Sequence, residues 1–126
     1  MISRKALAVG IDNYDFSPLS GCAEDADSFA KIMNKHDNTD QEKNFLVDVQ
    51  KNVPTKAKLK ELIRELFSHD YETALFYFSG HALFTDKRGY ILTPDYKQDD
   101  EGVSMDDILQ YANESRSLDK IILLDC

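Results

Sequence analysis

The chain has 126 residues, 42% of them hydrophobic, and a formal net charge of -8. This length fits one domain or part of one, and the apolar content is sufficient for a core. The acidic balance, without any run of Lys and Arg, argues against nucleic acid or an anionic membrane as a partner. No apolar run approaches the roughly 20 residues that span a bilayer, and no signal peptide precedes the first strand. Two cysteines without ligand spacing argue against a disulfide framework or a zinc site, so we expect a reducing, cytoplasmic setting.

Strands and helices alternate along the first half of the chain. Residues 5–11 form an apolar run that predicts a buried strand, and residues 23–35 place apolar side chains three and four apart, which predicts a helix. Residues 45–49 predict a second strand, which we expect near the sheet edge because it carries a charge. A second helix is expected to start at Pro54 and Thr55, with Thr55 as its cap, and to end near residues 68–70.

The second half continues this alternation. Residues 74–78 are continuously apolar and aromatic, as in a strand that is covered on both faces, and residues 121–124 repeat the pattern at the end of the chain. Between these strands we expect a loop after His81, a short apolar piece at 90–92, and a third helix that begins at a cap formed by Ser104.

This order of elements predicts an α/β fold with a mainly parallel sheet and helices on both faces. The chain ends two residues after the apolar run 121–124, with no helix to cover that strand. We therefore expect the sequence to be the front part of a longer domain.

Two reactive side chains follow the two most apolar strands. His81 comes after residues 74–78, and Cys126 comes after residues 121–124. Parallel strands bring their carboxyl ends to one edge of a sheet, where α/β proteins place their chemistry. A thiol and an imidazole at this edge predict a cysteine nucleophile with its base. The plainer interpretations are a structural histidine and a small buried hydrophobic residue.

The other two histidines carry no such signal. His36 and His69 follow predicted helices. We expect both to be helix-end residues that face solvent.

Four segments, in the same order, resemble the caspase-like cysteine peptidases of family C14. They resemble metacaspases and bacterial caspase homologues more than animal caspases, and they are residues 6–14, 19–26, 76–81 and 121–126. The resemblance covers nearly the whole chain. It implies a three-layer caspase-like sandwich, of which residues 1–126 would be the N-terminal, large-subunit part, truncated at the catalytic-Cys strand. It also implies a cysteine endopeptidase with protein or peptide substrates, completed by the remainder of its own caspase domain.

The resemblance implies a role for each residue at the strand ends. His81 matches the catalytic histidine, and the backbone N–H of Ala82 matches a donor to the oxyanion; the family usually has Gly there, but Ala retains the N–H. Two alignments of the thiol stay open. In the Asp-x-Cys pattern of metacaspases, Asp125 is the motif's Asp and the nucleophile is the residue after Cys126. In the alignment with animal caspases, Cys126 itself is the nucleophile.

The metacaspase alignment also implies a specificity pocket. Asp25, Ser79 and Asp125 match positions that form an acidic first pocket in metacaspases. Carboxylates at the floor of a pocket pair with guanidinium or ammonium groups, which implies cleavage after Arg or Lys. Cys22 is expected to pack at a helix start, although the resemblance also places a cysteine near the active site at this position.

No cofactor is expected to be required. Some metacaspases use Ca²⁺, and an acidic stretch could supply oxygen ligands, namely Asp95, Asp99, Asp100 and Glu101. Their spacing fits no fixed calcium loop, so we expect a solvated acidic loop.

Two other functions remain open. A non-catalytic caspase-like scaffold or regulatory module would act through protein contacts. A flavodoxin-like or receiver-like binding domain would need a Gly-rich phosphate loop after the first strand, where Gly10 stands alone.

Overall fold

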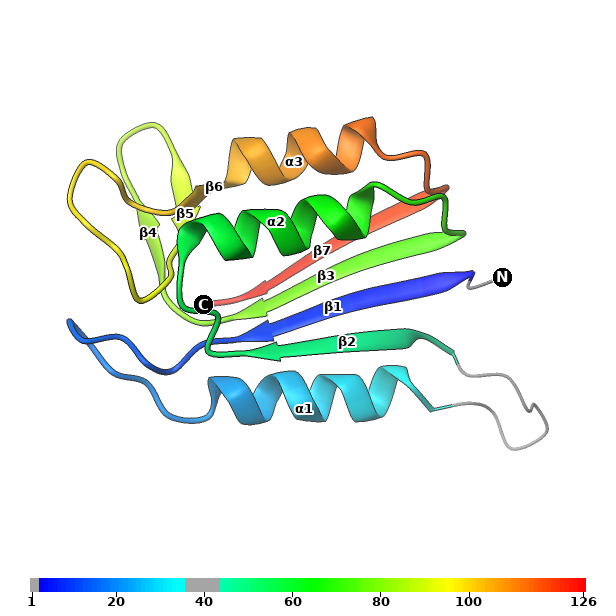
Figure 1. Ribbon diagram of the computed structural model, residues 1–126, viewed down its shortest axis with the longest axis horizontal. Coiled ribbons are helices and arrows are strands. Elements are labelled where there is room, and N and C mark those ends of the chain that lie inside the picture. Colours follow the sequence, from blue (N-terminus) through cyan, green and yellow to red (C-terminus); the bar gives the residue numbers. More distant parts are fainter. Residues whose placement is uncertain (1–2, 36–43) are drawn as a thin grey trace.

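A parallel sheet forms the middle layer of the computed structural model, which describes residues 3–35 and 44–126 (Figure 1). Its strands run in the order β2-β1-β3-β7 and are β1 (Arg4–Gly10), β2 (Leu46–Lys51), β3 (Thr73–Ser79) and β7 (Asp119–Asp125). One face is covered by α1 (Cys22–Met33) and the other by α2 (Lys56–Phe67) and α3 (Met105–Glu114) (Figure 1). The predicted α/β fold with a mainly parallel sheet and helices on both faces is confirmed.

Each face of the sheet carries an apolar core. The larger core lies under α2 and α3 and includes Phe76, Phe78 and Ile63. The smaller core lies under α1 and includes Ala6 and Leu75. Because β1 and β3 bury side chains on both faces, their sequences are continuous apolar runs instead of alternating ones.

The two edge strands differ from each other. The charged strand β2 lies at one edge, as predicted. The apolar strand β7 lies at the other edge, where Ile121, Leu123 and Leu124 are 38%, 43% and 37% exposed. This exposure fits the observation from the sequence that no helix follows the strand to cover it.

A small antiparallel sheet follows β3 directly. It consists of β4 (Ala82–Phe84), β5 (Gly89–Ile91) and β6 (Val103–Ser104). The expectation of a loop after His81 is therefore wrong, because Ala82 begins a strand. A polar turn, closed by a 2.8 Å hydrogen bond from the Thr85 N–H to the Arg88 carbonyl, joins β4 to β5. This sheet lies beyond the carboxyl ends of the parallel strands (Figure 1).

The helices α2 and α3 begin at the predicted caps. The Thr55 hydroxyl accepts a 3.2 Å hydrogen bond from the Lys58 N–H, and the Ser104 hydroxyl accepts one of 3.1 Å from the Asp107 N–H. Each cap satisfies a backbone donor that the first helical turn leaves free.

The helix α1 begins without a side-chain cap of its own, because its N-cap residue is Gly21. The carboxylate of Asp12, just after β1, takes over this role: its oxygens accept hydrogen bonds from the N–H groups of Cys22 (2.9 Å) and Ala23 (3.2 Å). Gly10 allows this close approach, since a Cβ there would lie 2.1 Å from the Cys22 carbonyl oxygen. The first turn of α1 is thereby held against the carboxyl edge of the sheet.

Candidate active site

The carboxyl ends of β3 and β7 lie side by side at one edge of the sheet. Ser79 and Asp125 are partners in the parallel ladder, and the Gly80 N–H donates a 3.4 Å hydrogen bond to the Asp125 carbonyl. Cys126 follows Asp125 and His81 follows Gly80. The structure thus brings the two predicted strand ends together, as their apolar runs and parallel pairing imply.

The imidazole of His81 is held by the loop between β1 and α1. Its Nε2 lies 2.7 Å from the carbonyl oxygen of Ser17. A carbonyl can only accept a hydrogen bond, so this contact assigns the proton of the neutral ring to Nε2 and leaves a lone pair on Nδ1. Phe16 and Tyr14 flank the ring, with centroid distances of 5.6 Å and 4.6 Å. The contact with Ser17 therefore fixes the orientation of the ring and leaves Nδ1 as its hydrogen-bond acceptor.

The residues of the predicted acidic pocket also lie together. The Ser79 hydroxyl donates a 3.2 Å hydrogen bond to Asp25 Oδ2, and Asp125 is the ladder partner of Ser79. Both carboxylates are exposed, whereas Ser79 is buried. Two exposed carboxylates at one strand end can pair with a cationic side chain.

Tyr77 is a member of this group that the sequence analysis missed. Its hydroxyl donates a 3.3 Å hydrogen bond to Asp125 Oδ2, and its ring stacks on Phe29 of α1 at a centroid distance of 4.2 Å. Burial, together with the charge of Asp125, raises the pKa of Tyr77 to about 12, so the phenol keeps its proton and remains a donor. The strand alternation was the available signal, because positions 77 and 79 share one face of β3.

Two free thiols lie near the same edge: Cys22 is half-buried and Cys126 is exposed. Although the residue as a whole is exposed, partial burial of its thiol raises the pKa of Cys126, and the Asp125 charge and the Cys22 thiol raise it further. Burial also raises the pKa of the Cys22 thiol, against an opposing hydrogen bond with Ser79. A nucleophilic thiol needs a shift in the other direction. Cys22 lies at the start of α1, near Ser79.

The N–H of Ala82 points away from its own ladder. The Leu92 N–H donates a 3.0 Å hydrogen bond to the His81 carbonyl, next to the ladder pair Ala82 and Ile91. This pattern makes Ala82 and Ile91 a non-hydrogen-bonded pair, whose N–H groups do not bond across the ladder. Of the described residues that bear a side chain, only Asn52 and Asp99 have a positive φ. The methyl group of Ala82 is therefore accommodated without backbone strain, and its N–H faces outward.

The acidic loop is occupied by contacts within the protein. Asp95 accepts a 3.0 Å hydrogen bond from the Lys56 N–H, and Asp100 pairs with Lys56 Nζ at 2.9 Å. The hydrogen bond from the Lys56 ammonium lowers the pKa of Asp100. Glu101 accepts a 2.7 Å hydrogen bond from the Asp99 N–H. Over the part of the chain that the structure describes, no three His, Cys, Asp or Glu side chains converge as metal ligands.

His69 is exposed at the end of α2 and lies 2.9 Å from Glu65, which agrees with the prediction of a solvent-facing residue. His36 lies outside the described residues. Within 3–35 and 44–126, no helix has the length and apolar character needed to cross a membrane.

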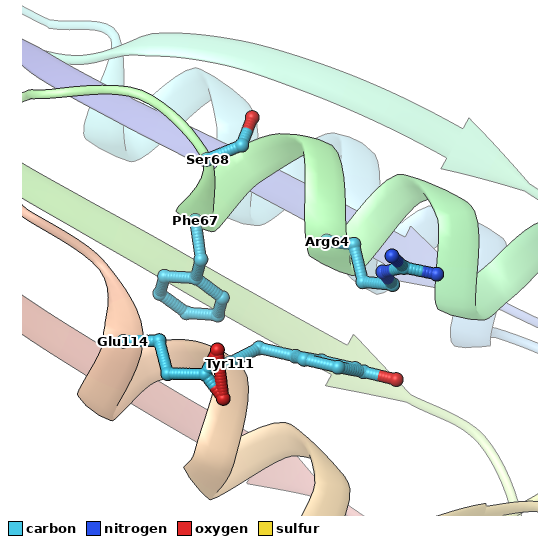
Figure 2. Close-up of a pocket in the computed structure, with 5 residues that line it drawn as sticks. All are labelled: Arg64, Phe67, Ser68, Tyr111 and Glu114. Atoms are coloured by element: carbon cyan, nitrogen blue, oxygen red, sulfur yellow. The ribbon is translucent and has the colours of Figure 1, made fainter.

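A cavity of about 220 Å³ lies between α2 and α3, and Figure 2 shows its lining residues Arg64, Phe67, Ser68, Tyr111 and Glu114. It lies at the C-terminal end of α2, whereas His81 follows the carboxyl end of β3. The C-terminal end of α2 and the carboxyl end of β3 point in opposite directions (Figure 1). The cavity therefore contributes nothing to the group around His81.

Comparisons with known proteins identify the family. A search of curated proteins found no match to this chain. The family model of peptidase C14, described as the caspase domain, matches residues 3–126. This match agrees with the resemblance found in the four segments. The chain therefore belongs to the caspase domain family, peptidase C14.

Proposed function

We propose that this chain carries the catalytic histidine and the acidic specificity pocket of a cysteine endopeptidase of the caspase and metacaspase type. The observation that carries the proposal is the pairing of Ser79 with Asp125, because it places the strand end that bears His81 beside the end of β7. Membership of the peptidase C14 family supports a peptidase in general. The orientation of the imidazole by Ser17 supports a base in particular.

The proposed mechanism uses the groups at this edge in order. Nδ1 of His81 takes the proton of the thiol, and the thiolate attacks the carbonyl carbon of the scissile peptide bond. The N–H of Ala82, which points away from its ladder, donates to the developing oxyanion. The imidazolium then gives its proton to the leaving amine, and water hydrolyses the thioester.

We assign the nucleophile to the residue that follows Cys126 in the full-length protein. The parallel register sets Ser79 opposite Asp125. Continued by one residue, this register sets Gly80 opposite Cys126, and continued by two residues it sets His81 opposite the residue after Cys126. The raised pKa of the Cys126 thiol supports this assignment, because no activating shift acts on it. The alternative, Cys126 as the nucleophile, predicts instead a large loss of activity in Cys126→Ser.

The proposed cleavage site follows Arg or Lys. Asp25 and Asp125 both flank Ser79, and together they supply two negative charges to a small area. A guanidinium can donate hydrogen bonds to both carboxylates and also pairs with their charge, whereas an acidic side chain is repelled by them. The same three residues support a closer relation to metacaspases than to animal caspases.

The proposed enzyme is completed by the remainder of its own caspase domain and acts on a protein or peptide substrate. The exposed apolar side chains of β7 support a further strand at that edge, namely Ile121, Leu123 and Leu124. We propose no required cofactor, because the carboxylates of the acidic loop already have partners such as Lys56. The two free cysteines support a reducing, cytoplasmic setting.

The test assays the full-length protein on fluorogenic peptides that end in Arg, Lys or Asp. We expect cleavage after Arg and Lys, and we expect His81→Ala to lower kcat/KM by about 10²- to 10⁴-fold, the range of general acid–base catalysis. His69→Ala is the matched control, since His69 is an exposed helix-end histidine. Equal activity of wild type and His81→Ala would end the catalytic proposal and favour a non-catalytic scaffold. A preference for Asp would overturn the acidic pocket.

A further inference from the structure

The hydroxyl of Tyr14 lies between two backbone segments at the point where β3 ends and β4 begins. The His81 N–H donates a 3.1 Å hydrogen bond to the Tyr14 hydroxyl, which in turn donates one of 2.9 Å to the Leu92 carbonyl. The side chain of Tyr14 is only 1% exposed. A single buried hydroxyl therefore joins the backbone of the proposed catalytic histidine to the strand beside it.

This bridge replaces one bond of the antiparallel ladder. Residues 81 and 92 occupy a hydrogen-bonded position of the ladder, where two residues normally exchange two N–H···O bonds. The Leu92 N–H does donate to the His81 carbonyl at 3.0 Å, but the reverse bond passes through the Tyr14 hydroxyl. Gly80 leaves the necessary room, since a Cβ there would lie 2.6 Å from the Tyr14 oxygen. The Tyr14 hydroxyl thus takes the place of a direct hydrogen bond between the His81 N–H and the Leu92 carbonyl.

The ring of Tyr14 also contacts the imidazole directly. The two rings meet edge to face, at a centroid distance of 4.6 Å and an interplanar angle of 62°. Ser17 fixes Nε2 of the same imidazole. Burial raises the pKa of Tyr14 far above its ordinary value, so the phenol stays neutral and acts as both donor and acceptor. The backbone and the ring of His81 are therefore both positioned by contacts with one side chain.

We propose that Tyr14 is a positioning residue of this peptidase, which fixes the backbone of His81 and Ala82 through its hydroxyl and the imidazole through its ring. The inference rests on the proposed function, because it assigns Tyr14 a part in that same site. Tyr14 acts through His81 and touches no substrate. Since the Ala82 N–H follows His81 directly, loss of the bridge displaces the oxyanion donor together with the base.

The test is Tyr14→Phe in the full-length protein, which removes the bridge and keeps the ring. We expect kcat on an Arg peptide to fall by about 10- to 100-fold, the cost of a small misplacement of catalytic groups, with little change in KM. The assay is made at a temperature at which circular dichroism shows both proteins to be folded. Tyr111→Phe, between α2 and α3, is the matched control and should keep wild-type kcat (Figure 2). A variant with 4-aminophenylalanine at position 14 restores a donor and an acceptor, and it should recover much of the lost kcat.

The results distinguish a failure of the role proposed for Tyr14 from a failure of the proposed peptidase function. A protein that needs His81 but has an unchanged kcat in Tyr14→Phe overturns this inference alone. A protein that does not need His81 overturns the proposed function. If Tyr14→Phe does not fold, the bridge is tested in the wild-type protein by NMR. The Tyr14 hydroxyl proton should then exchange slowly with water and show a cross-peak to the His81 amide, and absence of that cross-peak overturns the inference.

Discussion

Ser79 on β3 and Asp125 on β7 are direct partners in the parallel ladder, and the Ser79 hydroxyl also reaches Asp25. One ladder position therefore gathers the three residues of the proposed pocket. It also fixes the register of the residues that follow on both strands. Cys126 is opposite Gly80, one residue before the position opposite His81. The proposed roles of Asp125 and Cys126 are thus linked by the ladder.

Cys126→Ser in the full-length protein should retain activity of the same order as wild type. The reason is that Cys126 lies one position short of His81, and the pKa of its thiol is raised. The measurement is kcat/KM on an Arg peptide, with a substitution of the following residue for comparison. A loss of about a millionfold in Cys126→Ser, as for removal of a serine-peptidase nucleophile, would identify Cys126 as the nucleophile instead.

Asp25→Asn and Asp125→Asn should each lower kcat/KM on Arg peptides by about 10- to 100-fold, because a hydrogen bond to a charged group is lost. The loss should shrink at high salt, which screens the attraction in the wild type. Asp27→Asn is the control on the same helix, since Asp27 pairs with Lys51 at 3.0 Å. The pocket assignment fails if Asp27→Asn costs as much as Asp25→Asn, or if neither pocket substitution lowers activity.

The residues of the candidate site that are distinguished by their side chains could be located from the sequence. His81 could be placed because it follows a continuous apolar strand, and Asp25, Ser79 and Asp125 were placed through the family resemblance. The structure brings all four to one edge of the sheet. The parallel sheet itself was predictable, since buried strands of this kind differ clearly in pattern from amphipathic helices.

The contacts that orient the site could not be predicted in this way. Ser17 acts through its carbonyl, which every residue possesses, and Tyr14 bridges to a carbonyl 78 residues away. The hairpin of β4 and β5 consists of three-residue strands around a polar turn, too short to show a period. The exposure of β7 depends on which elements pack beside it, and its own sequence does not contain that information.

Asp12→Ala should lower both stability and activity. The Asp12 carboxylate caps α1, so its removal should cost about 1 kcal/mol of unfolding free energy, and α1 carries Asp25 in its first turn. Thr55→Ala is the matched control: it removes the cap of α2 at a similar cost in stability, and α2 carries no residue of the site. Urea unfolding gives the free energies, and kcat/KM gives the activities. If both variants lose the same fraction of activity, the cap has no particular importance for the site.

Three of the six tyrosines should resist ionisation in the folded protein, because burial raises the pKa values of Tyr14, Tyr71 and Tyr77. Burial raises the pKa of Tyr77 to about 12 and raises that of Tyr14 further, from an ordinary value of 10.0. Above pH 10 the unfolded chain loses phenolic protons that the folded protein retains, so the unfolded state binds fewer protons. The resulting stabilisation is complete below pH 10, and the part that Tyr77 contributes is lost as the pH rises through about 12.

The free energy of unfolding should therefore fall with rising pH over this range, and Tyr77→Phe should make the fall shallower. Urea unfolding at a series of alkaline pH values measures the slope, and an ultraviolet difference titration counts the tyrosines that ionise late. Tyr111→Phe is the matched control, since this phenol lies on α3 and makes neither the hydrogen bond to Leu92 nor the one to Asp125. A single titration of all six phenols near 10.0 would show that the hydroxyls of Tyr14 and Tyr77 are open to water, and it would remove the basis for their hydrogen bonds to Leu92 and Asp125.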